Sequence, residues 1–127
     1  MPGKRIYLDN AATTRTDDRV LQAMIPCFSE EYGNASSLHH YGTKAKETLE
    51  NSRVALGKCI GAEPGEIYFT SGGTESNNWA LKGIAQANRH KGRHIIVSSI
   101  EHDCVLNTCN WLAEQGFFIT WLPVDSN

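Results

Sequence analysis

The fold is decided by one stretch, residues 66–78, which reads Glu-Ile-Tyr-Phe-Thr-Ser-Gly-Gly-Thr-Glu-Ser-Asn-Asn. Its residues 67–69 are a short run of β-forming side chains, which predicts a buried strand. The Ser-Gly-Gly sequence at 71–73 ends that run. Thr74 or a neighbour is then expected to cap a helix over about residues 75–88.

A strand, a glycine turn and a helix N-terminus together predict an anion site. Free N–H groups and the helix dipole point at such a turn, and glycine lets a ligand approach the backbone. We expect a phosphate there, with the hydroxyl of Thr74 as a further donor. The alternative is a tight turn whose glycines only permit a sharp reversal. The spacing fits neither a P-loop nor a dinucleotide fingerprint, so the stretch alone leaves both interpretations open.

The composition is that of a soluble globular protein. The 127 residues suffice for one domain or part of one, with 40% hydrophobic and 20% charged residues. A net charge of −2 argues against a nucleic-acid-binding or membrane-binding surface. No apolar run reaches membrane-spanning length, and the first residues resemble neither a signal nor a transit peptide. A cytoplasmic location is therefore expected.

Cysteine and histidine spacing predicts no metal site. The four cysteines show no Cys-x-x-Cys pair, so reduced thiols are expected; they are Cys27, Cys59, Cys104 and Cys109. His90 and His94 have helical spacing, but Gly92 lies between them, where a helix is expected to end. The adjacent histidines at 39–40 have no nearby cysteine or second carboxylate at ligand spacing.

Two helices are expected before the central stretch. Residues 6–8 suggest a short strand, and Asp17 then caps a helix that Pro26 should kink or end. A second, long helix is expected from residue 39 or 41 to 59, with Gly61 closing the segment. Residues 1–60 are therefore interpreted as an N-terminal arm with helices.

Residues 61–127 are interpreted as the beginning of a sheet domain. After the central strand and helix, residues 94–98 carry an apolar run typical of a buried parallel strand. A helix over about 104–115 and a strand over 117–122 follow. Helices followed by β-α-β-α-β predict an α/β fold with a mostly parallel sheet.

Two loops are expected to leave carboxyl ends of strands, where such sheets bind ligands. They are the turn at 70–74 and the loop at 98–103, and we expect them to share one cleft. His102, in the second loop, has two interpretations: an imidazole that stacks on a flat ring or moves a proton, or a capping or solvated loop histidine. Cys104 is interpreted as a thiol facing the core rather than as a nucleophile.

Four segments, in order, resemble the cysteine desulfurases of the NifS/IscS kind, which are pyridoxal-phosphate enzymes of the class V aminotransferase family. Residues 7–14, Tyr-Leu-Asp-Asn-Ala-Ala-Thr-Thr, look like the opening motif of that family. Residues 33–39, Gly-Asn-Ala-Ser-Ser-Leu-His, are similar to the second, although Ala35 stands where proline is common. Residues 69–78 and 98–102 match the third and fourth.

The resemblance implies a fold, a cofactor and a reaction. Residues 61–127 would begin the large domain of a fold type I transferase. Gly73 and Thr74 would hold the phosphate of pyridoxal 5'-phosphate, and His102 would stack on its ring and assist proton transfer. The family converts L-cysteine to L-alanine and leaves the sulfur as an enzyme persulfide, for iron–sulfur cluster assembly or tRNA thiolation. A homodimer and a sulfur-acceptor or scaffold protein are the implied partners.

The resemblance also implies that essential parts are missing. The Schiff-base lysine of the family, in a Ser-x-His-Lys motif, its acidic partner of the pyridine nitrogen and its persulfide cysteine all follow the fourth motif at a distance. His90 and Lys91 imitate the lysine motif, but Asn88 replaces its serine and the position in family order is wrong. The chain thus looks like the first third of the enzyme and is expected to be inactive alone. The alternatives are a non-catalytic phosphate-binding or interaction module, and another class V activity such as selenocysteine lyase or cysteine sulfinate desulfinase.

Overall fold

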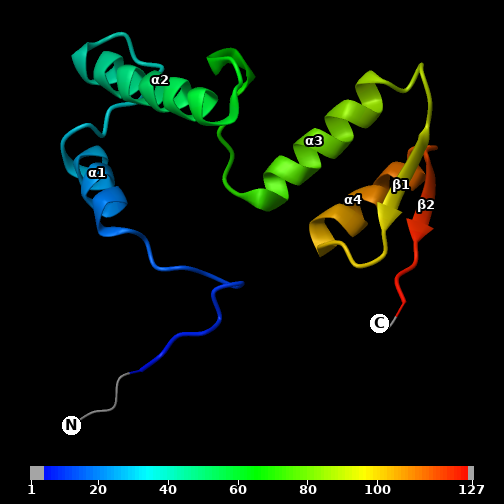
Figure 1. Ribbon diagram of the computed structural model, residues 1–127. Helices are drawn as coiled ribbons and strands as arrows, with labels where there is room; N and C mark the ends of the chain where they lie inside the picture. Colours follow the sequence, from blue (N-terminus) through cyan, green and yellow to red (C-terminus); the bar gives the residue numbers. More distant parts are fainter. Residues whose placement is uncertain (1–4, 126–127) are drawn as a thin grey trace. The chain divides into compact units, whose positions relative to one another are not determined.

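The computed structural model describes residues 5–125. The chain divides into two structural units, Met1–Tyr68 (unit 1) and Phe69–Asn127 (unit 2). Unit 1 contains helices α1 and α2, and unit 2 contains helices α3 and α4 and strands β1 and β2 (Figure 1). The domain boundary expected after residue 60 stays a prediction.

Helix α1, Asp18–Ser29, begins where its capping residue predicts. The Oδ1 atom of Asp17 accepts the N–H of Arg19 at 2.8 Å, and the Arg19 guanidinium also binds this carboxylate. The hydrogen bonds from Arg19, the side-chain bond first, lower the pKa of Asp17. Pro26 is expected to kink or end the helix; it does not end it, because α1 continues to Ser29, and the kink stays a prediction. Its own carbonyl still accepts the N–H of Glu30 at 2.8 Å.

Helix α2, His40–Ile60, confirms the long helix predicted from sequence. His39 caps its start, with Nδ1 accepting the N–H of Gly42 at 3.4 Å. Gly61 ends it in the left-handed conformation, at φ 70°, as a C-terminal glycine should. Gly42 is buried, and a Cβ atom there would lie 2.2 Å from the carbonyl oxygen of Ser37. Gly42 is therefore required by a close approach between the preceding loop and the helix.

Two strands predicted in the first 69 residues are absent from the described part of that segment. Residues 6–8 form no strand, and all three side chains are exposed. Residues 67–69 follow the 3-10 helix Pro64–Glu66 and also form no strand, although the carbonyl of Ile67 accepts a hydrogen bond from Arg53. A strand exists only when its backbone pairs with a neighbour. A run of β-forming residues cannot provide that neighbour.

Unit 2 follows the predicted order more closely. Its elements are α3 (Gly73–Ala87), β1 (His94–Ser98), α4 (Asp103–Glu114) and β2 (Phe118–Leu122). Strands β1 and β2 pair in parallel, with His94 opposite Phe118 and Ser98 opposite Leu122, and α4 connects them. This β-α-β unit confirms the predicted α/β fold with a parallel sheet.

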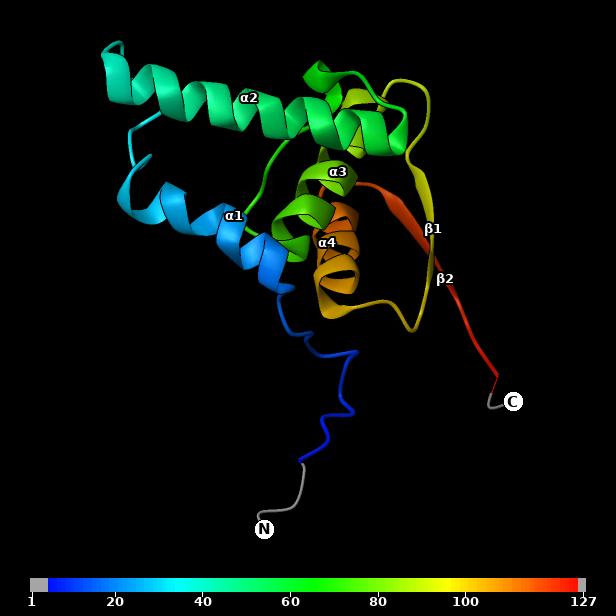
Figure 2. The same ribbon diagram turned by 60° about the vertical axis from the view of Figure 1, so that its left-hand side comes forward.

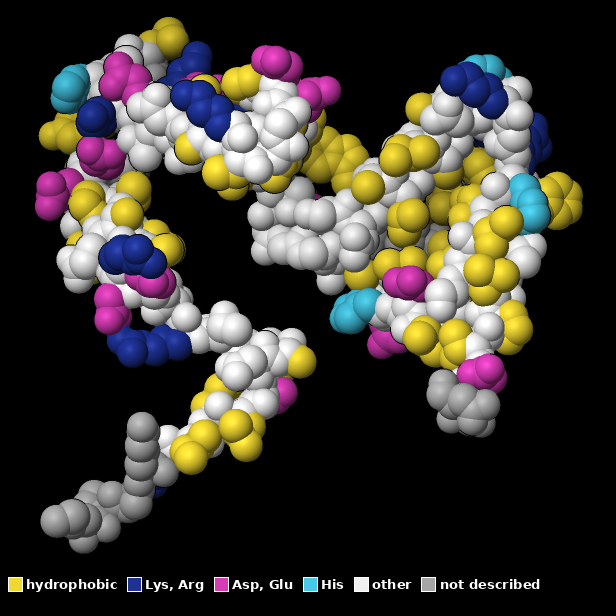
Figure 3. Space-filling model, viewed as in Figure 1, with side chains coloured by type: hydrophobic (Ala, Val, Ile, Leu, Met, Phe, Trp, Pro, Cys, Tyr) yellow, Lys and Arg dark blue, Asp and Glu magenta, His cyan; other side chains and the backbone are white. Residues whose placement is uncertain are grey.

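The core of unit 2 lies along α4 and the start of β2. Its buried side chains are Cys104, Thr108, Cys109, Leu112 and Phe117. On the sheet, Ile95, Val97 and Ile119 are half-buried. Ile96, on the opposite face, is 61% exposed. The prediction that the apolar run at 94–98 is buried is therefore wrong for this residue. Alternate strand residues point to opposite faces, and no described element of unit 2 covers the face that carries Ile96. Figure 3 shows hydrophobic side chains at the surface of both units.

Neither a membrane span nor a metal cluster is found in the described part of the chain. None of the helices in residues 5–125 combines the length and the apolar character needed to cross a bilayer. The same residues hold no group of three or more histidine, cysteine, aspartate or glutamate side chains that could bind a metal ion. The cytoplasmic location stays a prediction.

Candidate active site

The glycine turn leads directly into α3. Gly72 is the N-cap, and its carbonyl accepts the N–H of Ser76 at 3.1 Å. The prediction that Thr74 or a neighbour caps the helix is therefore corrected: the helix begins at Gly73, and Thr74 lies in its first turn. No side chain caps this end of α3, because glycine has none to offer.

The two glycines of the turn are not required by the packing of the chain. A Cβ atom added at Gly72 or Gly73 would meet no other atom within 4 Å. Gly72 is extended, with φ 160°, and Gly73 is already helical, so a left-handed conformation does not explain either residue. Packing thus gives no steric reason for either glycine, and the choice between a phosphate site and a simple tight turn stays a prediction. Open space over the backbone is what a ligand at this turn needs.

Hydrogen bonds within the turn fix its shape and leave helix donors available. The backbone N–H and the hydroxyl of Ser71 both donate to Oε2 of Glu75, each at 2.7 Å. These bonds, the backbone one first, lower the pKa of Glu75. The N–H groups of Gly73, Thr74 and Glu75 precede the first helical hydrogen bond, which Ser76 makes. Three backbone donors and the Thr74 hydroxyl therefore gather at this terminus.

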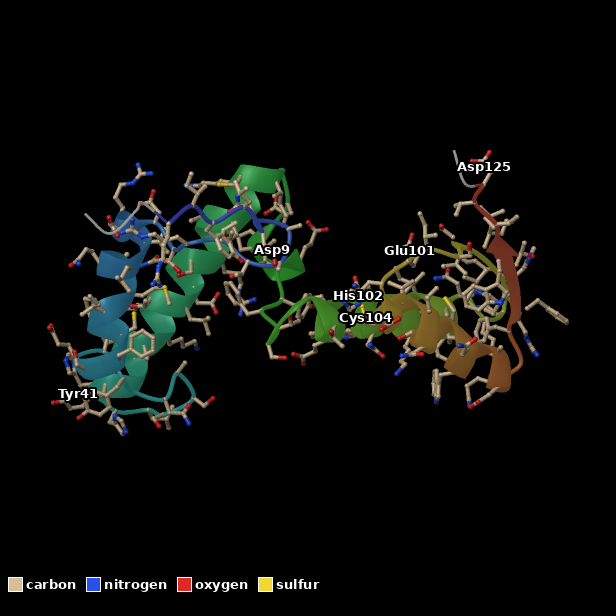
Figure 4. All side chains as sticks on the ribbon, turned by 90° about the horizontal axis from the view of Figure 1, so that it is seen from below. Asp9, Tyr41, Glu101, His102, Cys104 and Asp125 are labelled. Carbon is tan, nitrogen blue, oxygen red and sulfur yellow. The ribbon has the colours of Figure 1, made fainter. Side chains whose placement is uncertain are left out.

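His102 is the N-cap of α4. Its Nδ1 atom accepts the N–H of Cys104 at 3.1 Å, which confirms the capping interpretation. The cap uses the lone pair of Nδ1, so the neutral ring carries its proton on Nε2. The side chain is exposed, and its ring face stays open to a ligand. Figure 4 shows His102 beside Cys104 at the start of α4.

The thiol of Cys104 faces the core, as predicted. The residue is 9% exposed, and its Sγ accepts a hydrogen bond from Nδ2 of Asn77 at 3.2 Å. Burial, aided by the charge of Glu101, raises the pKa of the neighbouring core thiol, Cys109. Both thiols lie in the interior of unit 2 rather than at its surface, which is not the environment of an activated nucleophile.

Helices α3 and α4 lie side by side and run in the same direction (Figure 2). Contact partners follow the same order along the two segments. Asn77 donates to Cys104, Lys82 lies over the Trp111 ring at 4.7 Å, and Arg89 donates to the carbonyl of Gln115. Their N-termini therefore lie at the same end of unit 2, where β1 also ends. The turn at 70–74 and His102 share this end, and a common cleft stays a prediction.

The lysine of the His90-Lys91 pair lies at the other end of α3. The N–H of Lys91 bonds to the carbonyl of Asn88, the C-cap residue. Helix α3 has 15 residues, so about 22 Å of helix separates Lys91 from the glycine turn. A side chain at that distance cannot serve a ligand bound at Thr74.

Two residues that connect the site, Asn78 and Thr108, were not predicted from the sequence. Nδ2 of Asn78 donates to the carbonyl of Thr74 at 3.0 Å, and the hydroxyl of Thr108 lies 2.9 Å from Oδ1 of Asn78. Thr108 is only 2% exposed. The available signal was a polar residue four positions after Thr74, on the same face of the helix.

The sequence profile of the family described as aminotransferase class-V matches residues 6–127. The chain belongs to this family. It is 55% identical, over 122 residues, to a cysteine desulfurase IscS of Methanosarcina thermophila, and the match covers 96% of this chain and 30% of that protein. The chain thus spans about a third of the length of the curated relatives it matches.

Solved structures of the family show the same fold. A NifS-like protein superposes with a TM-score of 0.88 at 46% identity, over 97% of this chain and 34% of the other. A second structure, SspA in complex with cysteine, gives a TM-score of 0.79 at 43% identity, over 88% of this chain and 32% of the other. Members of the family generally use pyridoxal phosphate.

The residues at the shared end of unit 2 fit that cofactor. Backbone N–H groups at a helix N-terminus, with a hydroxyl beside them, are the donors that a phosphate monoester needs. The open space over Gly72 and Gly73 gives it access. The exposed imidazole of His102 offers a flat face to a pyridine ring.

Proposed function

We propose that this chain supplies the phosphate and ring contacts of a pyridoxal-phosphate-dependent cysteine desulfurase. The observation that carries the proposal is the open glycine turn at the start of α3, beside a second helix N-terminus that presents His102. The relatives named cysteine desulfurase support the choice of reaction within the family.

Gly73 and Thr74 are assigned to the phosphate. The N–H groups of the first turn of α3 and the Thr74 hydroxyl would donate to its oxygens, and the helix dipole favours its negative charge. The Glu75 carboxylate does not compete for these donors, because it is engaged by the backbone and side chain of Ser71.

His102 is assigned to the ring face and to proton transfer. When bound, the cofactor supplies an electron sink for the bonds of the substrate amino acid. The neutral imidazole keeps its proton on Nε2 while Nδ1 caps α4. It can therefore donate a hydrogen bond from Nε2 without disturbing the cap, whereas it can take up a proton, and later give it back, only at Nδ1, which requires the cap to open.

L-cysteine is the proposed substrate. One solved relative is described as a complex with cysteine, and the named relatives are cysteine desulfurases. The products would be L-alanine and sulfur held as an enzyme persulfide. A homodimer and a sulfur-acceptor or scaffold protein are the proposed partners, and none of the thiols of this chain is proposed as the sulfur carrier.

A full-length chimera tests this function. This chain would replace the matching segment of the Methanosarcina thermophila relative, to which it is 55% identical. We expect the chimera to release sulfide and alanine from L-cysteine under reducing conditions, while this chain alone releases neither. Lys91→Ala serves as the matched control and should leave the activity of the chimera unchanged.

Two outcomes would contradict the proposal. A folded chimera that binds pyridoxal phosphate but acts only on selenocysteine or cysteine sulfinate would favour another class V activity. Sulfide release by this chain alone that disappears in Lys91→Ala would show that the lysine in the turn after α3 is catalytic after all.

A further inference from the structure

Hydrogen bonds through Asn78, Thr108 and the backbone of Cys104 connect Thr74 with His102, two of the residues assigned to the cofactor. Nδ2 of Asn78 donates to the carbonyl of Thr74 at 3.0 Å, and Oδ1 of Asn78 accepts from the Thr108 hydroxyl at 2.9 Å. The same hydroxyl lies 2.8 Å from the carbonyl of Cys104, so its one proton is shared between two acceptors. The N–H of Cys104 then donates to Nδ1 of His102 at 3.1 Å.

We infer that Asn78 and Thr108 are positioning residues that hold Thr74 and His102 at a fixed spacing. The inference rests on the proposed function, because it concerns the contacts of a single bound cofactor. Neither side chain needs to touch the cofactor. Each fixes the position of α3 along the axis of α4. This position sets the distance between the phosphate turn and the imidazole.

Burial explains why this connection is rigid. Thr108 is 2% exposed and Asn78 is half-buried, so water does not replace a broken bond at low cost. Asn77 adds a second connection through the buried thiol of Cys104, at 3.2 Å. Two further contacts, from exposed Arg89 to the Gln115 carbonyl and from Lys82 to the Trp111 ring, lie farther from the site. The relative position of α3 and α4 is therefore fixed at the end of unit 2 where the cofactor would bind.

Two probes separate positioning from general stability. Inorganic phosphate needs only the turn at Thr74, whereas pyridoxal phosphate needs the turn and His102 at the correct spacing. In the full-length chimera, we expect Asn78→Ala to weaken pyridoxal-phosphate binding by about threefold to tenfold, the loss of one or two net hydrogen bonds. Inorganic phosphate affinity should stay unchanged. Thr108→Val should act in the same way, and Thr108→Ser should restore the affinity.

Asn88→Ala is the matched control. Its Nδ2 donates to the carbonyl of Ile84 at 3.0 Å, the same bond four residues apart, but at the far end of α3 and without a described bridge to α4. We expect no change in either affinity. Equal weakening of both probes by Asn78→Ala would overturn the positioning role, as would no weakening of either.

Amide hydrogen exchange in this chain gives a readout that needs no cofactor. The Cys104 N–H is protected by His102, so loosening the bridge should speed its exchange by about tenfold in Asn78→Ala and not in Asn88→Ala. Unchanged exchange would overturn the inference even if the cofactor binds. If the unmodified chimera binds neither probe, the proposed function fails, and the exchange result still decides whether the bridge orders His102.

Discussion

Replacing His102 by phenylalanine lowers turnover by about 10²–10⁴-fold in the full-length chimera, the usual contribution of a positioned proton donor or acceptor. Cofactor affinity falls little, because the ring remains and stacking of this kind is worth only about 0.5–1.5 kcal/mol. Dissociation of pyridoxal phosphate and single-turnover persulfide formation measure the two effects separately.

The capping role of His102 requires a second comparison. Phenylalanine and alanine both remove the Nδ1 acceptor, so each destabilises the start of α4 by about 1 kcal/mol. His102→Asn restores an acceptor for the Cys104 N–H without an aromatic ring. We expect Asn to retain stability but lose turnover, and Ala to lose stability, affinity and turnover together. Wild-type turnover in all three variants would show that His102 is only a capping residue.

Leu112→Ala destabilises unit 2 by about 2–5 kcal/mol, because it leaves a cavity in a closely packed core. Leu112 is fully buried and lies on α4, the helix that contacts both α3 and strand β2. Urea unfolding followed by tryptophan fluorescence measures the effect. All three tryptophans, at 79, 111 and 121, lie in unit 2, so the signal reports on that unit alone.

Leu38→Ala is the matched control for this substitution. Leu38 is 100% exposed and lies in unit 1, so the same chemical change should alter the free energy of unfolding by less than about 0.5 kcal/mol. If Leu112→Ala shifts the urea midpoint no more than Leu38→Ala does, the core assigned to unit 2 is wrong.

Local patterns predicted the elements that local interactions form. The Asp17 cap, the Gly61 stop and the apolar run at 94–98 each act within a few residues, and the structure confirms the elements that they predict. The strand predicted at 67–69 failed because a strand depends on a partner remote in sequence. The start of α3 was misplaced because Gly72 caps it through its backbone, and backbone caps leave no side-chain signal.

The candidate site was predicted only in part. Gly73, Thr74 and His102 stand out because glycine turns and loop histidines have recognisable chemistry. Asn78 and Thr108 do not: Asn78 ends the third motif without a chemistry that marks its role, and Thr108 lies in no motif. The two residues are about 30 positions apart in sequence, and only the packing of α3 against α4 brings them together.

The central claim is that the α3 N-terminus holds the cofactor phosphate. It is tested most directly by the ratio of the affinities for pyridoxal phosphate and for pyridoxal. In the full-length chimera we expect the phosphorylated form to bind at least about 100-fold more tightly, since hydrogen bonds to a charged group contribute about 1.5–3 kcal/mol each. Thr74→Val should reduce that ratio by about tenfold through a loss for pyridoxal phosphate alone, and Thr74→Ser should restore it. A ratio that Thr74→Val leaves unchanged would contradict the claim.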